Sequence, residues 1–201
     1  MKAITLCFLV LVSASCLLKT NANVDVHPDF QAAEVELDLW LAELEAEGDY
    51  MDVEQFGFIV SCAKILKKCL SSVRGVNCIL KEVVAVMKAC TDYVEAIDAC
   101  GVAVPKDVAT VVSSCKAMIT ICNNIIHLNS TLCASDDSTT SKCMLQLFKA
   151  CMQLTRKINT TLKQITKLPS DTSSCFVAAT SKVKTACNNF LPNIDKCIDS
   201  M

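Results

Sequence analysis

The chain has 201 residues and a formal net charge of −2, and 52% of its residues are hydrophobic whereas only 5% are aromatic. This length is enough for one domain with a sizeable core. The presence of only 4 glycines and 4 prolines favours helices over a turn-rich β fold. The acidic balance and the scarcity of aromatic side chains argue against nucleic-acid binding.

Residues 1–22 have the pattern of a secretory signal peptide. A positively charged start precedes an apolar run at residues 4–12, and Thr20-Asn21-Ala22 offers a small-residue cleavage site. Cleavage after Ser15 is the main alternative and would leave Cys16 in the mature protein. Because no later segment has about 18 uninterrupted apolar residues, we expect a secreted, extracellular protein without a transmembrane segment.

The segment at residues 23–55 is an acidic arm. It holds 11 acidic residues and no Lys or Arg, whereas residues 56–201 hold 17 basic and 10 acidic residues. Apolar residues recur within the arm at helical spacing, which predicts an amphipathic helix: Leu37, Trp40, Leu41 and Leu44. We favour a solvated helix packed by this face; the alternative is a propeptide or arm that docks on the basic body.

Residues 56–201 form a single cysteine-rich domain, in which apolar residues recur at steps of three and four along five segments. The predicted helices span residues 59–73, 78–100, 105–125, 140–168 and 173–200. Arg74-Gly75 is expected to end the first helix, Gly101 to end the second, and Pro105 to start the third. Residues 129–141 are a polar connector pinned by Cys133, and Pro192 should kink or split the last helix. The prediction is all-α.

Two stretches of this domain repeat one cysteine pattern. Residues 78–100 and 175–197 both have the form C-x11-C-x9-C. In register they share several residues: Val86/Val183, Ala89/Ala186, Cys90/Cys187, Ile97/Ile194 and Asp98/Asp195. Such matching at one spacing indicates an internal duplication. It also explains the two aspartates without any catalytic role.

Thirteen cysteines remain after the favoured cleavage: Cys62, Cys69, Cys78, Cys90, Cys100, Cys115, Cys122, Cys133, Cys143, Cys151, Cys175, Cys187 and Cys197. This density in a secreted chain predicts a disulfide framework. The odd number leaves one thiol free or bonded between molecules, which would permit a disulfide-linked dimer. No two cysteines are closer than C-x6-C and the histidines are His27 and His127 alone, so we expect no metal site.

The pairing of the cysteines stays open at this stage. Cysteines seven apart lie about 10.5 Å apart along a helix, too far for a disulfide between them. Each must therefore reach a neighbouring helix. In an up-down bundle the pairs Cys62–Cys115 and Cys69–Cys122 would satisfy both spacings, and a hairpin pairing such as Cys62–Cys90 is the alternative.

Two sequons fit a secreted glycoprotein. Asn129 begins Asn-Ser-Thr after a helix-like segment, and Asn159 begins Asn-Thr-Thr within a helical pattern. Asn129 is therefore the more accessible of the two predicted glycosylation sites.

The leader, the helical cysteines and the closing CFVAATSKVKTACNNFLPNIDKC together resemble insect secreted proteins that carry the tsetse EP-protein domain. The resemblance covers roughly residues 58 to 200 and leaves the acidic arm outside. It implies a helical extracellular module in gut, haemolymph or other secretions. It brings no catalytic residues to this chain.

No catalytic motif is present: the sequence lacks G-x-S-x-G, H-E-x-x-H and a phosphate-binding glycine loop. We therefore expect no catalytic residues, no cofactor and no enzymatic activity. The favoured function is a secreted binding protein that holds an apolar or lipid-like ligand between disulfide-linked helices. The alternative is an extracellular protein-interaction or host-defence factor that has a filled core and acts through its surface. In both cases the ligand or partner is unknown.

Overall fold

The structure, a computed structural model, describes residues 53–70, 72–131 and 140–199, together with four isolated positions of the acidic arm at 35, 38, 39 and 42. The regular elements in this part of the chain are all helices: α3 (Val53–Leu70), α4 (Val73–Ala99), α5 (Lys106–Thr131), α6 (Thr140–Thr166) and α7 (Ser174–Asp199). The all-α prediction is therefore confirmed. The expected signal peptide and the expected apolar face of the arm lie outside the described residues.

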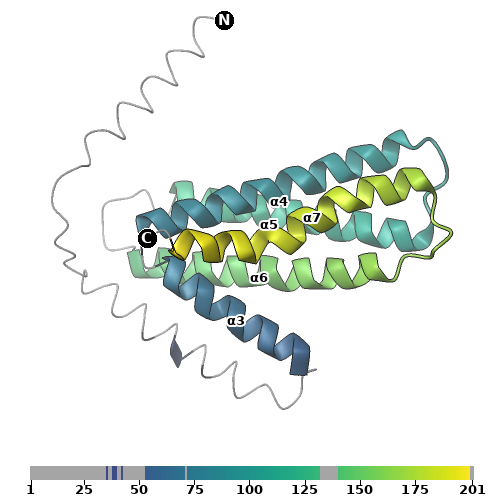
Figure 1. Ribbon diagram of the computed structural model, residues 1–201. Coiled ribbons are helices and arrows are strands. Elements are labelled where there is room, and N and C mark those ends of the chain that lie inside the picture. The colour runs from purple at the N-terminus through teal and green to yellow at the C-terminus, as the bar shows by residue number, and fades with distance from the viewer. Residues whose placement is uncertain are drawn as a thin grey trace, which may run out of the picture.

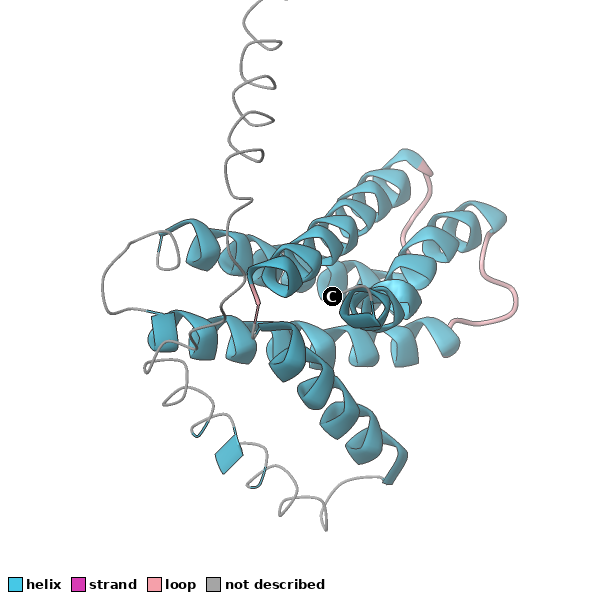
Figure 2. Ribbon diagram, turned by 60° about the vertical axis from the view of Figure 1, so that its left-hand side comes forward, coloured by secondary structure: helices cyan, strands magenta, loops and turns pink. Residues whose placement is uncertain are grey.

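The helices α4, α5, α6 and α7 lie lengthwise beside one another, and α3 runs obliquely away from one end of them (Figure 1). The α4 helix packs against α5 and α7, α5 packs in turn against α6, and α3 contacts α4, α6 and α7. Figure 2 shows the α4–α5 and α6–α7 loops at the same end of the bundle. The α3 helix thus packs on the side where α6 and α7 face each other.

The junction of α3 and α4 differs from the expectation. Arg74-Gly75 was predicted to end the first helix, but both residues lie in the first turn of α4. Ser72 is the N-cap of α4, and its hydroxyl accepts a hydrogen bond of 3.0 Å from the Gly75 backbone N–H. A Cβ atom on Gly75 would lie 2.0 Å from the carbonyl oxygen of Cys69. This glycine therefore permits the close approach of two helices instead of ending one.

Other helix boundaries agree with the sequence. Gly101 follows α4 with a φ of 65°, the conformation expected of a glycine after a helix, and Pro105 directly precedes α5. The α7 helix continues through Pro192, so the proline does not split it. The α5 helix extends to Thr131. The first residues of the predicted connector are therefore helical, and Cys133 lies outside the described residues.

The core consists of aliphatic and sulfur-containing side chains with a few aromatic rings. The buried stripe of α4 steps by three and four along the helix, and each of its members is at most 2% exposed: Val83, Val86, Cys90, Tyr93 and Ile97. The largest buried rings are those of Tyr93, Phe148, Phe176 and Phe190. Each fully buried aliphatic or aromatic side chain contributes about 1.5–3 kcal/mol to folding.

The duplicated segments form α4 and α7, which are joined to each other by two disulfides. Cys78 bonds to Cys197 and Cys100 bonds to Cys175, with Cα–Cα distances of 6.3 and 6.1 Å. In each bridge the first cysteine of one copy meets the last cysteine of the other. The two copies therefore pair antiparallel, and exchanging one copy for the other leaves the bridges unchanged. Cys143 is also disulfide-bonded.

Seven cysteines that were expected to form disulfides are instead buried free thiols, so the prediction of a nearly complete disulfide framework is wrong. They are Cys62, Cys69, Cys90, Cys115, Cys122, Cys151 and Cys187. The pairing of Cys62 with Cys115 and of Cys69 with Cys122 fails because α3 packs on α4, α6 and α7 and not beside α5. The alternative hairpin pairing of Cys62 with Cys90 is also wrong, because both thiols are free. These residues fill core positions on the buried helical stripes.

The disulfides indicate an extracellular or otherwise oxidising environment. Within α5, the segment Lys106–Asn129 is long and apolar enough to cross a membrane by length and composition. The core helix of a soluble bundle passes the same test, and the buried stripe of α5 packs against α4 and α6: Val108, Val111, Cys115, Met118, Cys122 and Ile125. The packing buries 39% of the most apolar window of this segment.

Candidate functional site

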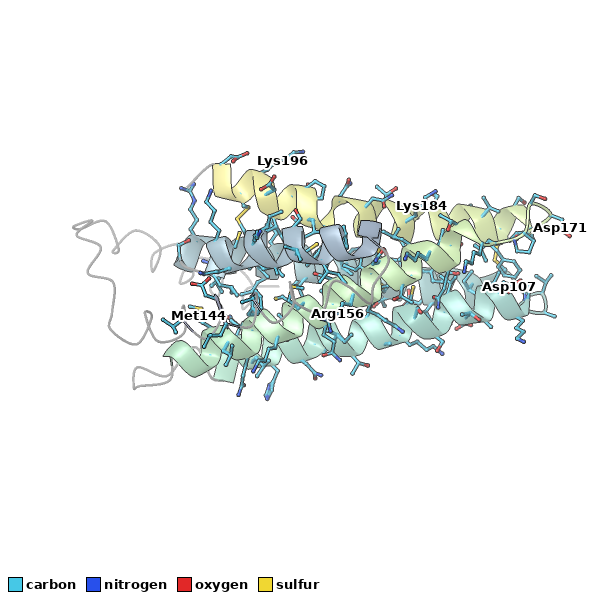
Figure 3. The ribbon with its side chains drawn as sticks, turned by 90° about the horizontal axis from the view of Figure 1, so that it is seen from below. Asp107, Met144, Arg156, Asp171, Lys184 and Lys196 are labelled. Carbon is cyan, nitrogen blue, oxygen red and sulfur yellow. A yellow bond between two sulfur atoms is a disulfide. The ribbon has the colours of Figure 1, made fainter. Side chains whose placement is uncertain are left out.

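A pocket with a volume of about 370 Å³ lies where α3, α6 and α7 meet. Each helix contributes one stripe at helical spacing, because residues three, four and seven apart share a face. The stripes are Phe58, Ser61, Cys62 and Ile65 on α3, Thr155, Ile158 and Leu162 on α6, and Asn188, Leu191, Pro192 and Asp195 on α7, which also contributes Cys187 and Phe190. Figure 3 is seen from this side of the bundle, with α3 in front of α6 and α7.

The pocket has a buried floor and a partly exposed rim. The floor is formed by side chains that water hardly reaches: Cys62, Thr155, Ile158, Cys187 and Phe190. The rim combines half-buried apolar side chains with exposed Ser61, Asn188, Pro192 and Asp195. An apolar floor with a few polar groups at the mouth is the usual composition of a small-molecule site, and such sites span about 300–1,000 Å³.

Pro192 shapes the α7 side of the pocket. Proline has no N–H, so the carbonyl of Asn188, four residues earlier, lacks its regular helical donor. Both residues line the pocket, and a helical carbonyl points towards the residue four positions ahead. The carbonyl therefore lies at the pocket face of α7. Beyond the proline, Asn193 donates a 2.8 Å hydrogen bond from Nδ2 to Oε2 of Glu82, which holds this part of α7 to α4.

The two thiols in the pocket are electrically neutral. Burial raises the pKa of Cys62 to about 12 and that of Cys187 to about 12. Only the thiolate is a strong nucleophile or metal ligand, so at neutral pH both side chains present a soft apolar surface. The pocket floor thus offers shape and hydrophobic contact, with no activated nucleophile.

Other free thiols are buried elsewhere in the core. Cys115 of α5 lies beside Cys90 of α4, and this interaction together with burial raises the pKa of Cys90. Burial raises the pKa of Cys122 and of Cys151 to about 12. Among the described residues no group of three or more His, Cys, Asp or Glu side chains is placed to hold a metal ion.

The pKa of Cys69 depends on two charges besides burial, those of Asp195 on α7 and of the adjacent Lys68 on α3. Burial raises its pKa to about 11, Asp195 raises it further, and Lys68 lowers it. Its thiol donates to the carbonyl of Ile194 at 3.8 Å. Cys69 therefore lies close to the rim aspartate but shows the same protonated state as the pocket thiols.

The predicted glycosylation sites both fall inside helices. Asn129 lies in the last turn of α5 and Asn159 in the middle of α6, and each is half-buried. The sequence suggested that Asn129 follows the helix, but it lies within the helix. The two aspartates that correspond in the duplication have different surroundings. Asp195 lines the pocket, whereas Asp98 is exposed on α4 and does not line it.

Among the residues that the structure describes, an ion pair links the acidic arm to the body. Asp38 of the arm forms a salt bridge with the ammonium group of Lys67 on α3. The side chain of Asp38 is 60% exposed and that of Lys67 is 22% exposed, so this contact contributes less than about 1 kcal/mol. It agrees with the alternative in which the arm docks on basic residues.

A second pocket, of about 400 Å³, lies at the opposite end of the bundle beside the α4–α5 and α6–α7 loops. Its lining includes exposed loop residues and the carboxylates Asp107 and Asp171. It lacks the continuous buried floor of the α3–α6–α7 pocket. The latter is therefore the better candidate for a small ligand.

Sequence reasoning missed the pocket because the pocket depends on how α3 packs against helices distant in sequence. One local signal was available. Pro192 lies inside a helical pattern, on the same face as Asn188 and Asp195. A proline within a helix exposes an acceptor on that face.

No family model, curated protein or solved structure matches this chain. The resemblance to the tsetse EP-protein domain accordingly stays a prediction.

Proposed function

We propose that this protein is a secreted, non-enzymatic binding protein that holds a small apolar ligand in the α3–α6–α7 pocket. The observation that carries this proposal is the pocket itself, a space of about 370 Å³ between three helices with a floor of buried side chains. Three helices from distant parts of the chain are needed to form it. Its floor is buried, apolar and neutral.

The covalent structure supports an extracellular setting. The two bridges between α4 and α7 require an oxidising environment, and residues 1–22 have the pattern of a cleaved leader. A binding protein outside the cell benefits from a scaffold that resists unfolding while one side stays accessible. Here the bridges lie on the α4 side of α7, and none joins α3 to α6 or α7 among the described cysteines.

The proposal is tested with protein secreted from eukaryotic cells and the neutral fluorescent probe N-phenyl-1-naphthylamine. We expect probe fluorescence to rise on binding, and the variant Ser61→Trp to abolish the rise by filling the mouth of the pocket. Ser181→Trp places the same ring on an exposed position of α7 that does not line the pocket, and it should bind the probe normally. Equal binding by both variants would contradict the proposal.

Native mass spectrometry of the same preparation tests for a natural ligand. Extra mass that survives in the native spectrum and disappears on denaturation would identify a bound small molecule. If the protein carries no extra mass and also fails to bind the probe, the alternative function is favoured, that of a protein-interaction or host-defence factor acting through its surface. The exposed apolar side chains of Val102 and Val104 on the α4–α5 loop would then be the first surface to investigate for a protein partner.

A further inference from the structure

The mouth of the pocket is rich in hydrogen-bond acceptors. Asp195 is the acidic residue in the described lining of the pocket. The Asn188 carbonyl, which lacks its regular helical donor because of Pro192, lies on the same face of α7 about two turns earlier. A carboxylate and a free carbonyl both accept hydrogen bonds and both attract positive charge.

The carboxylate of Asp195 is available to a ligand. Its residue is exposed, and no cation among the described residues forms an ion pair with it. Lys68 on α3 is a cation near Cys69, and it lowers the pKa of that thiol whereas Asp195 raises it. Asp195 nevertheless keeps its acceptor positions free at the rim.

We infer that the pocket takes an amphiphilic amine, with its apolar tail on the floor and its protonated amino group at Asp195 and the Asn188 carbonyl. This inference rests on the proposed function, since it names the class of ligand for the same pocket. The tail would contact Ile158, Cys187 and Phe190. The ammonium group has three N–H donors, which suit a carboxylate and a carbonyl presented from one helix face.

The duplication supplies an internal comparison for this assignment. Asp98 occupies the position in α4 that Asp195 occupies in α7, and each follows a buried isoleucine. Pro192 corresponds to Glu95, so α4 keeps a regular helix where α7 has lost a hydrogen bond. The acceptor-rich mouth thus belongs to one copy alone. Asp98 is consequently a matched control for the removal of a single carboxylate.

The experiment uses three ligands that share one tail and differ in the head group: octylamine, octanol and octanoate. Each is titrated against protein loaded with N-phenyl-1-naphthylamine, and the loss of fluorescence reports displacement. We expect octylamine to bind about fivefold more tightly than octanol, as a partly exposed ion pair allows, and octanoate to bind most weakly. Asp195→Asn should remove the preference for the amine, whereas Asp98→Asn should retain it.

The outcomes separate this inference from the proposed function. If the probe binds in the pocket but the three ligands displace it equally, the inference fails and the proposed function stands. The inference also fails, and the proposed function again stands, if the amine preference persists in Asp195→Asn with its circular dichroism spectrum unchanged. If the probe does not bind, or binds equally to Ser61→Trp, both proposals fail together.

Discussion

The helices α4 and α7 carry the same cysteine pattern but have different surroundings. The α4 helix is packed against α5 and α7 along its length. The α7 helix packs against α4 on one side, while its other side faces α3 and α6 across the pocket. One repeated sequence has thus produced one helix that does not line the α3–α6–α7 pocket and one helix that does.

The residues that differ between the copies explain this division. The three cysteines and the Ile-Asp pair are retained in both copies, and the first and last cysteines form the bridges between them. On the pocket face, Thr91 and Glu95 of α4 are replaced by Asn188 and Pro192 of α7. A duplicated helix can therefore keep its pairing interface while the opposite face acquires another role.

The largest expected effect concerns the buried free thiols of the core, which lie on α3, α5 and α6 as well as on the duplicated helices α4 and α7. The folded pKa of five of them is raised from the ordinary value of 9.0 to about 11 or 12: Cys62, Cys69, Cys122, Cys151 and Cys187. A thiol whose pKa is higher in the folded than in the unfolded protein contributes its full stabilisation at pH values below the unfolded-state pKa. This stabilisation is lost as the pH rises from the unfolded-state pKa to the folded-state pKa. We expect the free energy of unfolding to fall by about 7 kcal/mol between pH 7 and pH 10.

Guanidinium unfolding at pH 7, 8.5 and 10 measures this loss. Cys151→Ala should lose about 1.4 kcal/mol less over the same range, because one thiol no longer titrates. Ellman's reagent should reach the seven buried thiols only after unfolding. A stability that does not change up to pH 10 would mean that these cysteines are bonded to one another.

The next effect is that of the bridges that join the copies. The paired substitution Cys78→Ala with Cys197→Ala opens a loop with a sequence separation of 119 residues. We expect the free energy of unfolding to fall by about 4–5 kcal/mol, mainly because the unfolded chain gains freedom. Replacement of Cys100 and Cys175, separated by 75 residues, should cost slightly less. Equilibrium unfolding of both variants tests this order.

A smaller change in the free energy of unfolding, this time an increase, is expected at Pro192, which corresponds to Glu95 in the other copy. Pro192→Ala restores an N–H that can bond to the Asn188 carbonyl, so it should stabilise the protein by about 1–3 kcal/mol. It should also weaken octylamine binding, because the carbonyl is no longer free. Thermal unfolding and probe displacement measure the two consequences. A variant that is more stable and binds equally well would remove the carbonyl from the proposed site.

The smallest effect concerns the polar contact between the copies. Asn193→Ala removes the 2.8 Å hydrogen bond to Glu82, and we expect the free energy of unfolding to decrease by about 1 kcal/mol. Since the bond holds α7 just beyond Pro192, probe affinity should decrease slightly as well. Chemical unfolding detects the first change, and an increase in stability would contradict the role assigned to this contact.

The sequence predicted the helices well because their apolar stripes are local. The spacing of Val83, Val86, Cys90, Tyr93 and Ile97 defines both α4 and its buried face. Gly101 and Pro105 marked the following boundary correctly. The prediction at Gly75 was wrong because the local sequence around a glycine is the same whether the glycine ends a helix or permits two helices to pack closely.

The pairing of cysteines and the pocket were not predictable in this way. A buried cysteine on a helical stripe has the same spacing whether it bonds or fills space, and the choice depends on which helices are neighbours. The position of α3 decides both questions, because its main contacts are with α4, α6 and α7. Only the tertiary arrangement shows that Cys62 lines a pocket and keeps a free thiol.

The symmetric bridges have a consequence for proteolysis. Cys78–Cys197 and Cys100–Cys175 both connect the part of the chain before residue 101 to the part after residue 174. A single cut anywhere between those two positions would therefore leave two fragments that remain covalently attached. Such a nicked protein would migrate as one species without reductant and as two with it, and its paired copies would stay aligned after the cut.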